Sequence, residues 1–144
     1  MRLYLDTSAL VKLYVDEEGS PLVQSAVDQA GLVATSAIAY VEARAAFVRR
    51  RHEGGLSARD YRRIIRDLAA GSARYLVVAI TDSLIRGAAR LAETHRLRAY
   101  AAVHLASAAA IHGRLAEPVL FASWDLGLEK AAKREGLKAL RSQK

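Results

Sequence analysis

Residues 3–10 read LYLDTSAL, a short apolar run that ends at a carboxylate and is followed by two hydroxyl side chains. Because its apolar residues do not alternate with polar ones, the run predicts a strand that is buried on both faces. Thr7 or Ser8 is expected to cap a helix that extends to Tyr14. The stretch therefore predicts a strand that leads directly into a helix, with Asp6 at the junction.

The same strand-then-helix pattern continues along the chain, with turn residues such as Ser20-Pro21 and Gly54-Gly55 between the elements. Strands that alternate with helices indicate parallel strands joined by right-handed crossovers. We therefore expect one α/β domain over residues 1–144, with a parallel sheet of about five strands. Strands are expected at residues 3–5, 32–34, 75–80, 118–122 and 137–140, and helices at residues 7–14, 21–30, 37–52, 58–70, 82–95, 99–112 and 126–135.

The composition fits a single domain with one core, because 52% of the 144 residues are hydrophobic. The chain has no Cys, which excludes a disulfide framework and a thiolate zinc site. No apolar stretch is long enough to cross a membrane, and the charged N-terminus does not resemble a signal peptide. We therefore expect a cytoplasmic protein.

The chain is strongly basic, with a net charge of +7 and a pI near 10.0. A basic surface favours polyanionic partners, of which nucleic acid is the most common. An arginine-rich soluble surface without any such partner would have the same composition. Charge alone therefore does not decide between these two interpretations.

Acidic residues follow two of the predicted strands, Asp6 after the first and Asp125 after the fourth, and Glu42 lies early in the helix after the second. Ligands of open parallel sheets bind beyond the carboxyl ends of the strands. Crowded carboxylates raise each other's pKa, and a bound divalent cation removes this repulsion. Carboxylate oxygens suit Mg²⁺ or Mn²⁺. The three acids together therefore indicate a divalent-metal site at this edge of the sheet.

Each of these acids also has a simpler interpretation when it is taken alone. The two aspartates are good helix caps, and the glutamate is of a kind common on exposed helix faces. Their joint placement at one edge of the sheet favours the metal site. Nearby hydroxyl side chains would hold the acids or a metal-bound water, or would cap helices: Thr7, Ser8 and Ser123.

Four stretches of the chain resemble the PIN-domain family, and within it the VapC-like toxins of bacterial and archaeal toxin–antitoxin pairs. They are LYLDTSALVKLY (3–14), ATSAIAYVEARAAF (34–47), LRAYAAVHLASAAA (97–110) and VLFASWDLGLEKAAKREGL (119–137). They occur in the family order and span nearly the whole chain. The resemblance implies an α/β fold with strand order 3-2-1-4-5, which places Asp6 and Asp125 on adjacent strands.

The resemblance also implies a function, a cofactor and partners. The function is that of an endoribonuclease that uses Mg²⁺ or Mn²⁺, with Asp6, Glu42 and Asp125 as catalytic acids and the two aspartates as metal ligands. Glu42 would act as an outer ligand or as the proton acceptor for the attacking water. A homodimer and a cognate antitoxin that covers the acidic site are implied as well. Basic residues near the site would contact RNA phosphates, or else lie on solvated helix faces: Arg44, Arg49 and Arg98.

The chain departs from the family pattern at Ala101, where the family has a metal-binding acid, usually aspartate. Nothing nearby replaces that acid, because Glu93 belongs to another predicted helix and Asp82 follows the strand at the far edge of the sheet. Our hypothesis is that Ala101 is a deliberate replacement that allows a toxic nuclease to be produced safely. A naturally degenerate nuclease is the second possibility.

Other classes of protein also carry an Asp after the first strand. Haloacid-dehalogenase-like enzymes need a second Asp two residues later, where this chain has Ser8. Receiver domains need an Asp after the third strand, which Asp82 could supply, and a Lys after the fifth, where Arg141 is the nearest cation. Both classes are therefore disfavoured. A non-catalytic PIN-like module that binds RNA or an antitoxin stays open as the alternative, because Ala101 offers no ligand.

Overall fold

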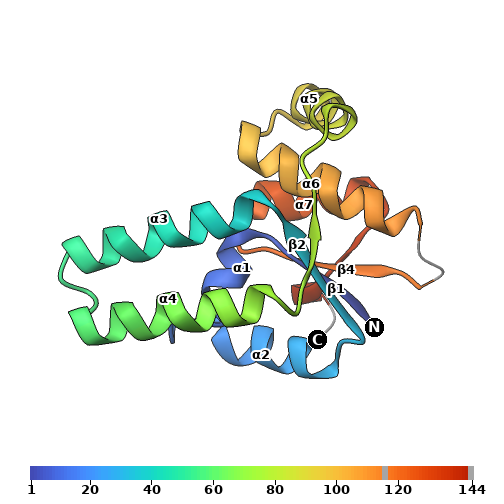
Figure 1. The fold of residues 1–144 in the computed structure, drawn as a ribbon. Coiled ribbons are helices and arrows are strands. Elements are labelled where there is room, and N and C mark those ends of the chain that lie inside the picture. The colour runs from blue at the N-terminus through green and yellow to red at the C-terminus, as the bar shows by residue number, and fades with distance from the viewer. Residues whose placement is uncertain (115–116, 143–144) are drawn as a thin grey trace.

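Within residues 1–114 and 117–142, which the computed structural model describes, five parallel strands form one sheet in the order β3-β2-β1-β4-β5 (Figure 1). The strands are β1 (Arg2–Leu5), β2 (Leu32–Ser36), β3 (Leu76–Val78), β4 (Val119–Ala122) and β5 (Lys138–Ala139). The helices are α1 (Thr7–Val11), α2 (Ser20–Gln29), α3 (Ile38–His52), α4 (Ala58–Ser72), α5 (Asp82–His95), α6 (Ala99–His112) and α7 (Leu126–Arg134), and a short 3₁₀ turn, η1 (Leu140–Ser142), follows β5. The expected α/β class and strand order are confirmed.

The first helix and the third strand fall furthest short of their predicted lengths. The first helix stops at Val11 rather than Tyr14, because the N–H groups of residues 12–14 bond to carbonyls three residues back and so tighten the chain into 3₁₀ turns. The third strand covers only Leu76–Val78 of the expected 75–80, since it is an edge strand that pairs with β2 alone. Neither difference moves the carboxyl ends of the central strands.

The core lies in two layers, one on each face of the sheet. Leu3 and Leu5 of β1 pack with α1, α2, α3 and α4 on one face. Tyr4, between them, points to the opposite face and packs with α6 and α7. This alternation explains the unbroken apolar run in the sequence, because both faces of β1 are covered. Helix α5 lies outside α6 and packs against it through Ala88.

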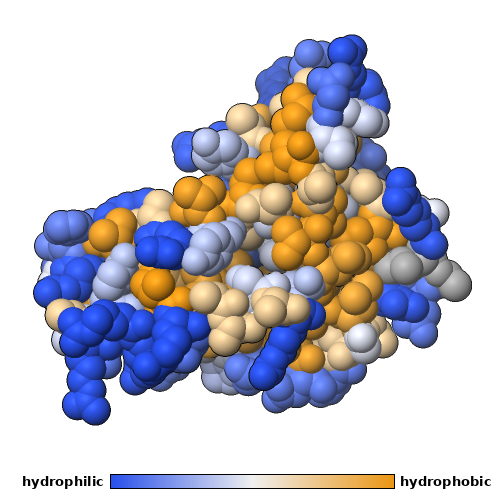
Figure 2. Space-filling view, viewed as in Figure 1, coloured by the Kyte–Doolittle hydropathy of each residue, from blue (hydrophilic) through white to orange (hydrophobic). Residues whose placement is uncertain are grey.

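The face of the molecule drawn in Figure 2 has an apolar and a polar part. Figure 2 shows an apolar band that runs over β3 towards α5, and its exposed members include Leu76, Val77 and Ile85. Figure 1 shows α3 and α4 extending together to one side, and Figure 2 shows that side as largely hydrophilic. Among the residues that the structure describes, no helix is both long and apolar enough to cross a membrane.

The strand register brings the ends of the central strands together. Leu5 of β1 lies opposite Ala122 of β4, and Tyr4 lies opposite Ala34 of β2. The residues that follow these strands therefore leave the sheet at one edge, as the sequence predicts for parallel strands. That edge holds the candidate site.

Candidate active site

Asp6 is the first acidic residue at this edge, and it is 4% exposed. Its carboxylate accepts hydrogen bonds from the Ala9 N–H at 3.0 Å and from Ser8 Oγ at 2.6 Å. Asp6 is thus the N-cap of α1, and the expectation that Thr7 or Ser8 caps this helix is wrong. The physical reason is that the short Asp side chain reaches the first free N–H groups, which leaves both hydroxyls for other contacts.

Asp125 lies across from Asp6, after β4, and its exposed side chain caps α7. The Asp125 N–H donates to Ser123 Oγ at 3.0 Å, and Ser123 also hydrogen-bonds to Asp6. The Trp124 N–H donates to Ser8 Oγ at 2.9 Å. Ser8 and Ser123 therefore connect the loops that carry Asp6 and Asp125. The two serines contact the acids, and neither serine caps a helix.

Trp124 anchors the loop that carries Asp125. The Lys12 ammonium lies 4.7 Å from the centre of the Trp124 ring, and the Arg141 guanidinium lies 5.1 Å from it. Gly19, with a φ of +91°, packs so closely that an added Cβ would lie 2.5 Å from the indole. The loop is therefore held by Lys12, which directly follows α1, and by Arg141 of η1.

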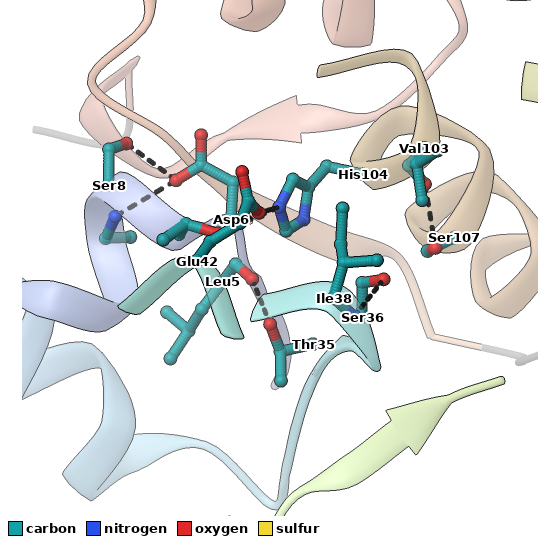
Figure 3. Close-up of polar contacts among 12 residues, drawn as sticks. Leu5, Asp6, Ser8, Thr35, Ser36, Ile38, Glu42, Val103, His104 and Ser107 are labelled. Carbon is teal, nitrogen blue, oxygen red and sulfur yellow. Dashed lines mark hydrogen bonds and ion pairs between the residues drawn. The ribbon is translucent and has the colours of Figure 1, made fainter. Parts of the chain in front are cut away.

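Glu42 reaches the site from α3, which starts where Ser36 Oγ at the end of β2 accepts the Ile38 N–H. The Glu42 Oε1 atom accepts from Thr7 Oγ1 and, at 2.8 Å, from His104 Nε2. Figure 3 shows Asp6, Glu42 and His104 converging from three different elements. Of the hydroxyls predicted to support the acids, Thr7 therefore holds the glutamate.

His104 and Tyr4 belong to this site, and sequence reasoning did not identify either of them. Tyr4 Oη lies 2.8 Å from His104 Nδ1, and both side chains are buried. The sequence did contain one signal: His104 follows Ala101 by three residues on the same predicted helix, which places both on one face. A polar side chain on the site-facing side of an alanine-rich helix marks a residue that has a buried partner.

The surroundings shift the pKa values of these groups in different directions. Burial raises the pKa of Asp6, opposed by the nearby His104 and by hydrogen bonds from Ser123, Ser8 and the Ala9 N–H. Burial also acts to raise the pKa of Glu42, but hydrogen bonds from His104 and Thr7 outweigh it, and the net pKa is lowered. The site therefore combines a readily ionised Glu42 with an Asp6 whose ionisation is costly.

Asp6→Asn is expected to make the protein more stable at pH 7. Because the native pKa of Asp6 is raised above its ordinary value, the native state binds more protons than the unfolded state between the two pKa values. The free energy of unfolding therefore falls as pH rises through that interval, and the loss persists at pH 7. Asn keeps the helix cap and carries no charge to bury.

Thermal unfolding at pH 7 and at about pH 3 measures this effect. The melting temperature of Asp6→Asn should exceed that of the parent at pH 7, and the difference should shrink at the lower pH. Asp16→Asn is the control, since Asp16 is exposed and should show little change. A less stable Asp6→Asn protein at pH 7 would mean that the charged carboxylate is net favourable here.

Ala101 occupies the first turn of α6, and its methyl group packs against the core cluster that includes Tyr4. The N-cap of this helix, Arg98, makes no side-chain capping bond, and the first turn contains no acidic residue. Ala101 offers no side-chain oxygen at the position where the family resemblance expects a metal ligand.

The side chains at this edge do not fit a metal ion as they stand. Residues 1–114 and 117–142 contain no group of three or more His, Cys, Asp or Glu side chains placed to hold one. Glu42 is engaged by His104 and Thr7, and Ala101 has no donor atom. The ligand roles of Asp6 and Asp125 stay a prediction.

The arginines predicted to contact RNA are all exposed. Arg44 donates to Tyr40 Oη at 3.1 Å on the surface of α3, and Arg49 lies in the last turn of that helix. Arg98 stands immediately before α6, three residues from Ala101. Their contact with RNA stays a prediction.

The fold and the acidic residues at the edge of the sheet together define a class of protein. Comparison with known families identifies that class. Residues 3–134 match the model of the PIN domain, and the chain belongs to the PIN-domain family. It is 33% identical over 142 residues to ribonuclease VapC45 of Mycobacterium tuberculosis, covering 98% of this chain and 96% of that protein.

Solved structures share the fold at lower identity. VapBC-1 from nontypeable Haemophilus influenzae matches with a TM-score of 0.65 and 14% identity, covering 96% of each chain. A toxin–antitoxin complex from Klebsiella pneumoniae matches with a TM-score of 0.58 and 16% identity, covering 83% of this chain and 84% of the other. These likenesses show a shared fold.

Proposed function

We propose that this chain is a VapC-like toxin whose active form is a metal-dependent endoribonuclease that hydrolyses RNA phosphodiester bonds. In this proposal the present chain is impaired, because Ala101 replaces an active-site aspartate. One observation carries it: in a PIN-domain chain that is 33% identical to a ribonuclease over 98% of its length, Asp6 and Glu42 converge at the sheet edge.

The described side chains have distinct tasks in this proposal. Glu42, whose pKa is lowered and which is therefore ionised, accepts the proton of the attacking water. Thr7 holds its carboxylate, while Ser8 and Ser123 fix the loops that carry Asp6 and Asp125. PIN-domain ribonucleases generally use divalent metal ions, such as Mg²⁺ or Mn²⁺, which activate water and balance the charge of the phosphate.

The basic surface supports RNA as the substrate. The net charge is +7, and exposed arginines lie on α3, which carries Glu42, and just before α6, which carries Ala101. Arg44, Arg49 and Arg98 are the residues we assign to the RNA phosphates. Such contacts release counterions, so binding should weaken steeply as salt is raised.

An antitoxin and a second copy of the chain are the proposed protein partners, and the cytoplasm is the proposed location. The solved neighbours include a toxin–antitoxin complex, which supports the first partner. The exposed apolar band over β3 and α5 supports self-association, because exposed patches of this kind commonly mark interfaces (Figure 2). Size-exclusion chromatography with light scattering measures whether two copies of the chain associate.

The alternative function is a PIN-like module that binds RNA or an antitoxin without cutting RNA. The lack of a donor at Ala101 and of a metal-holding cluster among the described residues favours it. The two functions differ in what restoring the acid does, because a binding module gains no activity from a carboxylate at position 101.

Cleavage of total cellular RNA by the purified Ala101→Asp protein tests the proposal. Parallel reactions contain Mg²⁺, Mn²⁺ or a chelator, and calorimetry measures metal binding. Cleavage that requires the metal supports the ribonuclease. If the folded variant neither binds metal nor cuts RNA, the binding module takes its place.

A further inference from the structure

We propose that His104 is a positioning residue that fixes the ionised carboxylate of Glu42 at the acidic edge, while Tyr4 fixes the imidazole ring. The proposal rests on the ribonuclease function above, because the geometry matters for the reaction only if Glu42 takes part in it. It assigns a role to the two buried polar residues of the site that the family resemblance did not single out.

Tyr4 is held rigidly enough to orient its neighbour. It is completely buried, and its ring stacks on Phe121 with centroids 5.6 Å apart and an interplanar angle of 2°. The His104 ring meets it edge-on, at 5.9 Å and 72°, with Tyr4 Oη 2.8 Å from Nδ1. One side of the imidazole is therefore fixed by a side chain that has little freedom to move.

The other side of the imidazole faces Glu42. His104 Nε2 lies 2.8 Å from Glu42 Oε1, and an ionised carboxylate can only accept hydrogen bonds. The hydrogen of this contact is therefore carried by Nε2, whichever way the proton between Tyr4 and Nδ1 lies. Thr7 Oγ1, 3.0 Å from Nε2, completes the contact around Oε1.

This arrangement fixes one carboxylate oxygen of Glu42 and leaves the other free to accept a proton. Both identified donors, Thr7 and His104, bind Oε1, and no hydrogen bond to Oε2 occurs within the part of the chain that the structure describes. Figure 3 shows His104 reaching Glu42 from the side opposite Asp6. His104 thus orients the free oxygen without contacting a substrate, which makes it a positioning residue.

Packing alone does not explain a histidine at this place. His104 is 3% exposed on a helix whose other buried residues are mostly Ala, Val, Leu and Ile. An imidazole buried there is costly unless both ring nitrogens are satisfied. Tyr4 satisfies Nδ1, and Glu42 together with Thr7 satisfies Nε2. A leucine would fill the same space without that requirement.

Nuclear magnetic resonance of the chain with Ala101 retained gives a test that needs no activity. Long-range ¹H–¹⁵N spectra at pH 7 should show His104 with a protonated Nε2, assigned by its loss in His104→Gln. Glu42→Gln should shift that signal, whereas Glu93→Gln, an exposed control, should not. An unprotonated Nε2, or a signal that does not shift in Glu42→Gln, would overturn the proposal.

Kinetics in the Ala101→Asp background tests the consequence for catalysis. His104→Leu should lower kcat about 10- to 100-fold, with KM changed less than about twofold. His104→Gln, which keeps a donor near the Nε2 position, should recover most of that loss.

The outcomes separate this proposal from the proposed function. If Ala101→Asp cuts no RNA, the ribonuclease fails and the spectra alone decide whether His104 holds Glu42. If it cuts RNA but Leu and Gln at position 104 are equally damaging, His104 has only a packing role. Melting temperatures of all variants exclude unfolding as the cause of a lost rate.

Discussion

Ala101→Asp is expected to raise the metal-dependent rate of RNA cleavage at least about 100-fold over the chain as it stands. The substitution adds a carboxylate one helical turn from His104, on the face of α6 that packs towards Tyr4. The N-terminus of α6 favours the new charge, since the first turn of this helix has free N–H groups and no acid. An aspartate there should favour the helix by about 0.3–1 kcal/mol.

Initial rates on a single end-labelled RNA, with and without chelator, measure this effect. Ala101→Asn is the matched control, because it has the same size and no charge, and its rate should stay near that of the parent. Adding Glu42→Gln to Ala101→Asp should return the rate to the background. Equal rates for the Asp and Asn variants would show that the carboxylate at position 101 is not what the site lacks.

The origin of Ala101 is a separate hypothesis, and the native gene decides it. A codon for aspartate there would support a deliberate replacement that silences a toxic nuclease. A codon for alanine would remove that idea and leave a naturally degenerate enzyme.

Phe47→Ala is expected to lower the free energy of unfolding by about 3–5 kcal/mol. Phe47 is completely buried, and it follows Ala39 and Ala43 at four-residue spacing on the inner face of α3. The substitution leaves a cavity under the helix that carries Glu42. Small residues at the two earlier positions bring the helix close to its neighbours, so they offer little volume to refill the space.

Urea unfolding followed by circular dichroism measures the loss. Val48→Ala on the same helix is the control, because Val48 is 38% exposed and should change stability by less than about 1 kcal/mol. Similar losses for the two variants would show that α3 is not anchored through Phe47. In the Ala101→Asp background, Phe47→Ala should also slow cleavage, since a loosened α3 misplaces Glu42.

The sequence predicts the sheet well because its signals are local. The strands are short, largely apolar runs, and turn residues separate several of them from the helices. Element ends are harder to predict, since neighbouring residues compete for the same free N–H groups. At the start of α1, Asp6 is the N-cap that Thr7 or Ser8 was expected to provide. All three residue types are good N-caps, so the sequence alone does not rank them.

The site is predictable where its residues follow a strand directly or, like Glu42, lie early in the helix after a strand. Asp6 and Asp125 follow β1 and β4 directly, and strand order then brings them to one edge. Tyr4 and His104 are 100 residues apart, and each fits its own element as a core residue. A hydrogen bond over such a separation depends on how α6 packs across the sheet, which no short motif encodes.

The cation-flanked Trp124 gives the acidic loop a built-in optical label. It is the single tryptophan of the chain, so fluorescence excited at the red edge of protein absorption comes from this loop alone. Its indole lies between Lys12 and Arg141, and its N–H group in the backbone is bonded to Ser8, which in turn donates to Asp6. Because a single hydroxyl group, that of Ser8, connects Asp6 to the backbone of Trp124, a change of charge at Asp6 should alter the fluorescence of Trp124. Titration of Asp6 can therefore be followed without attaching a dye.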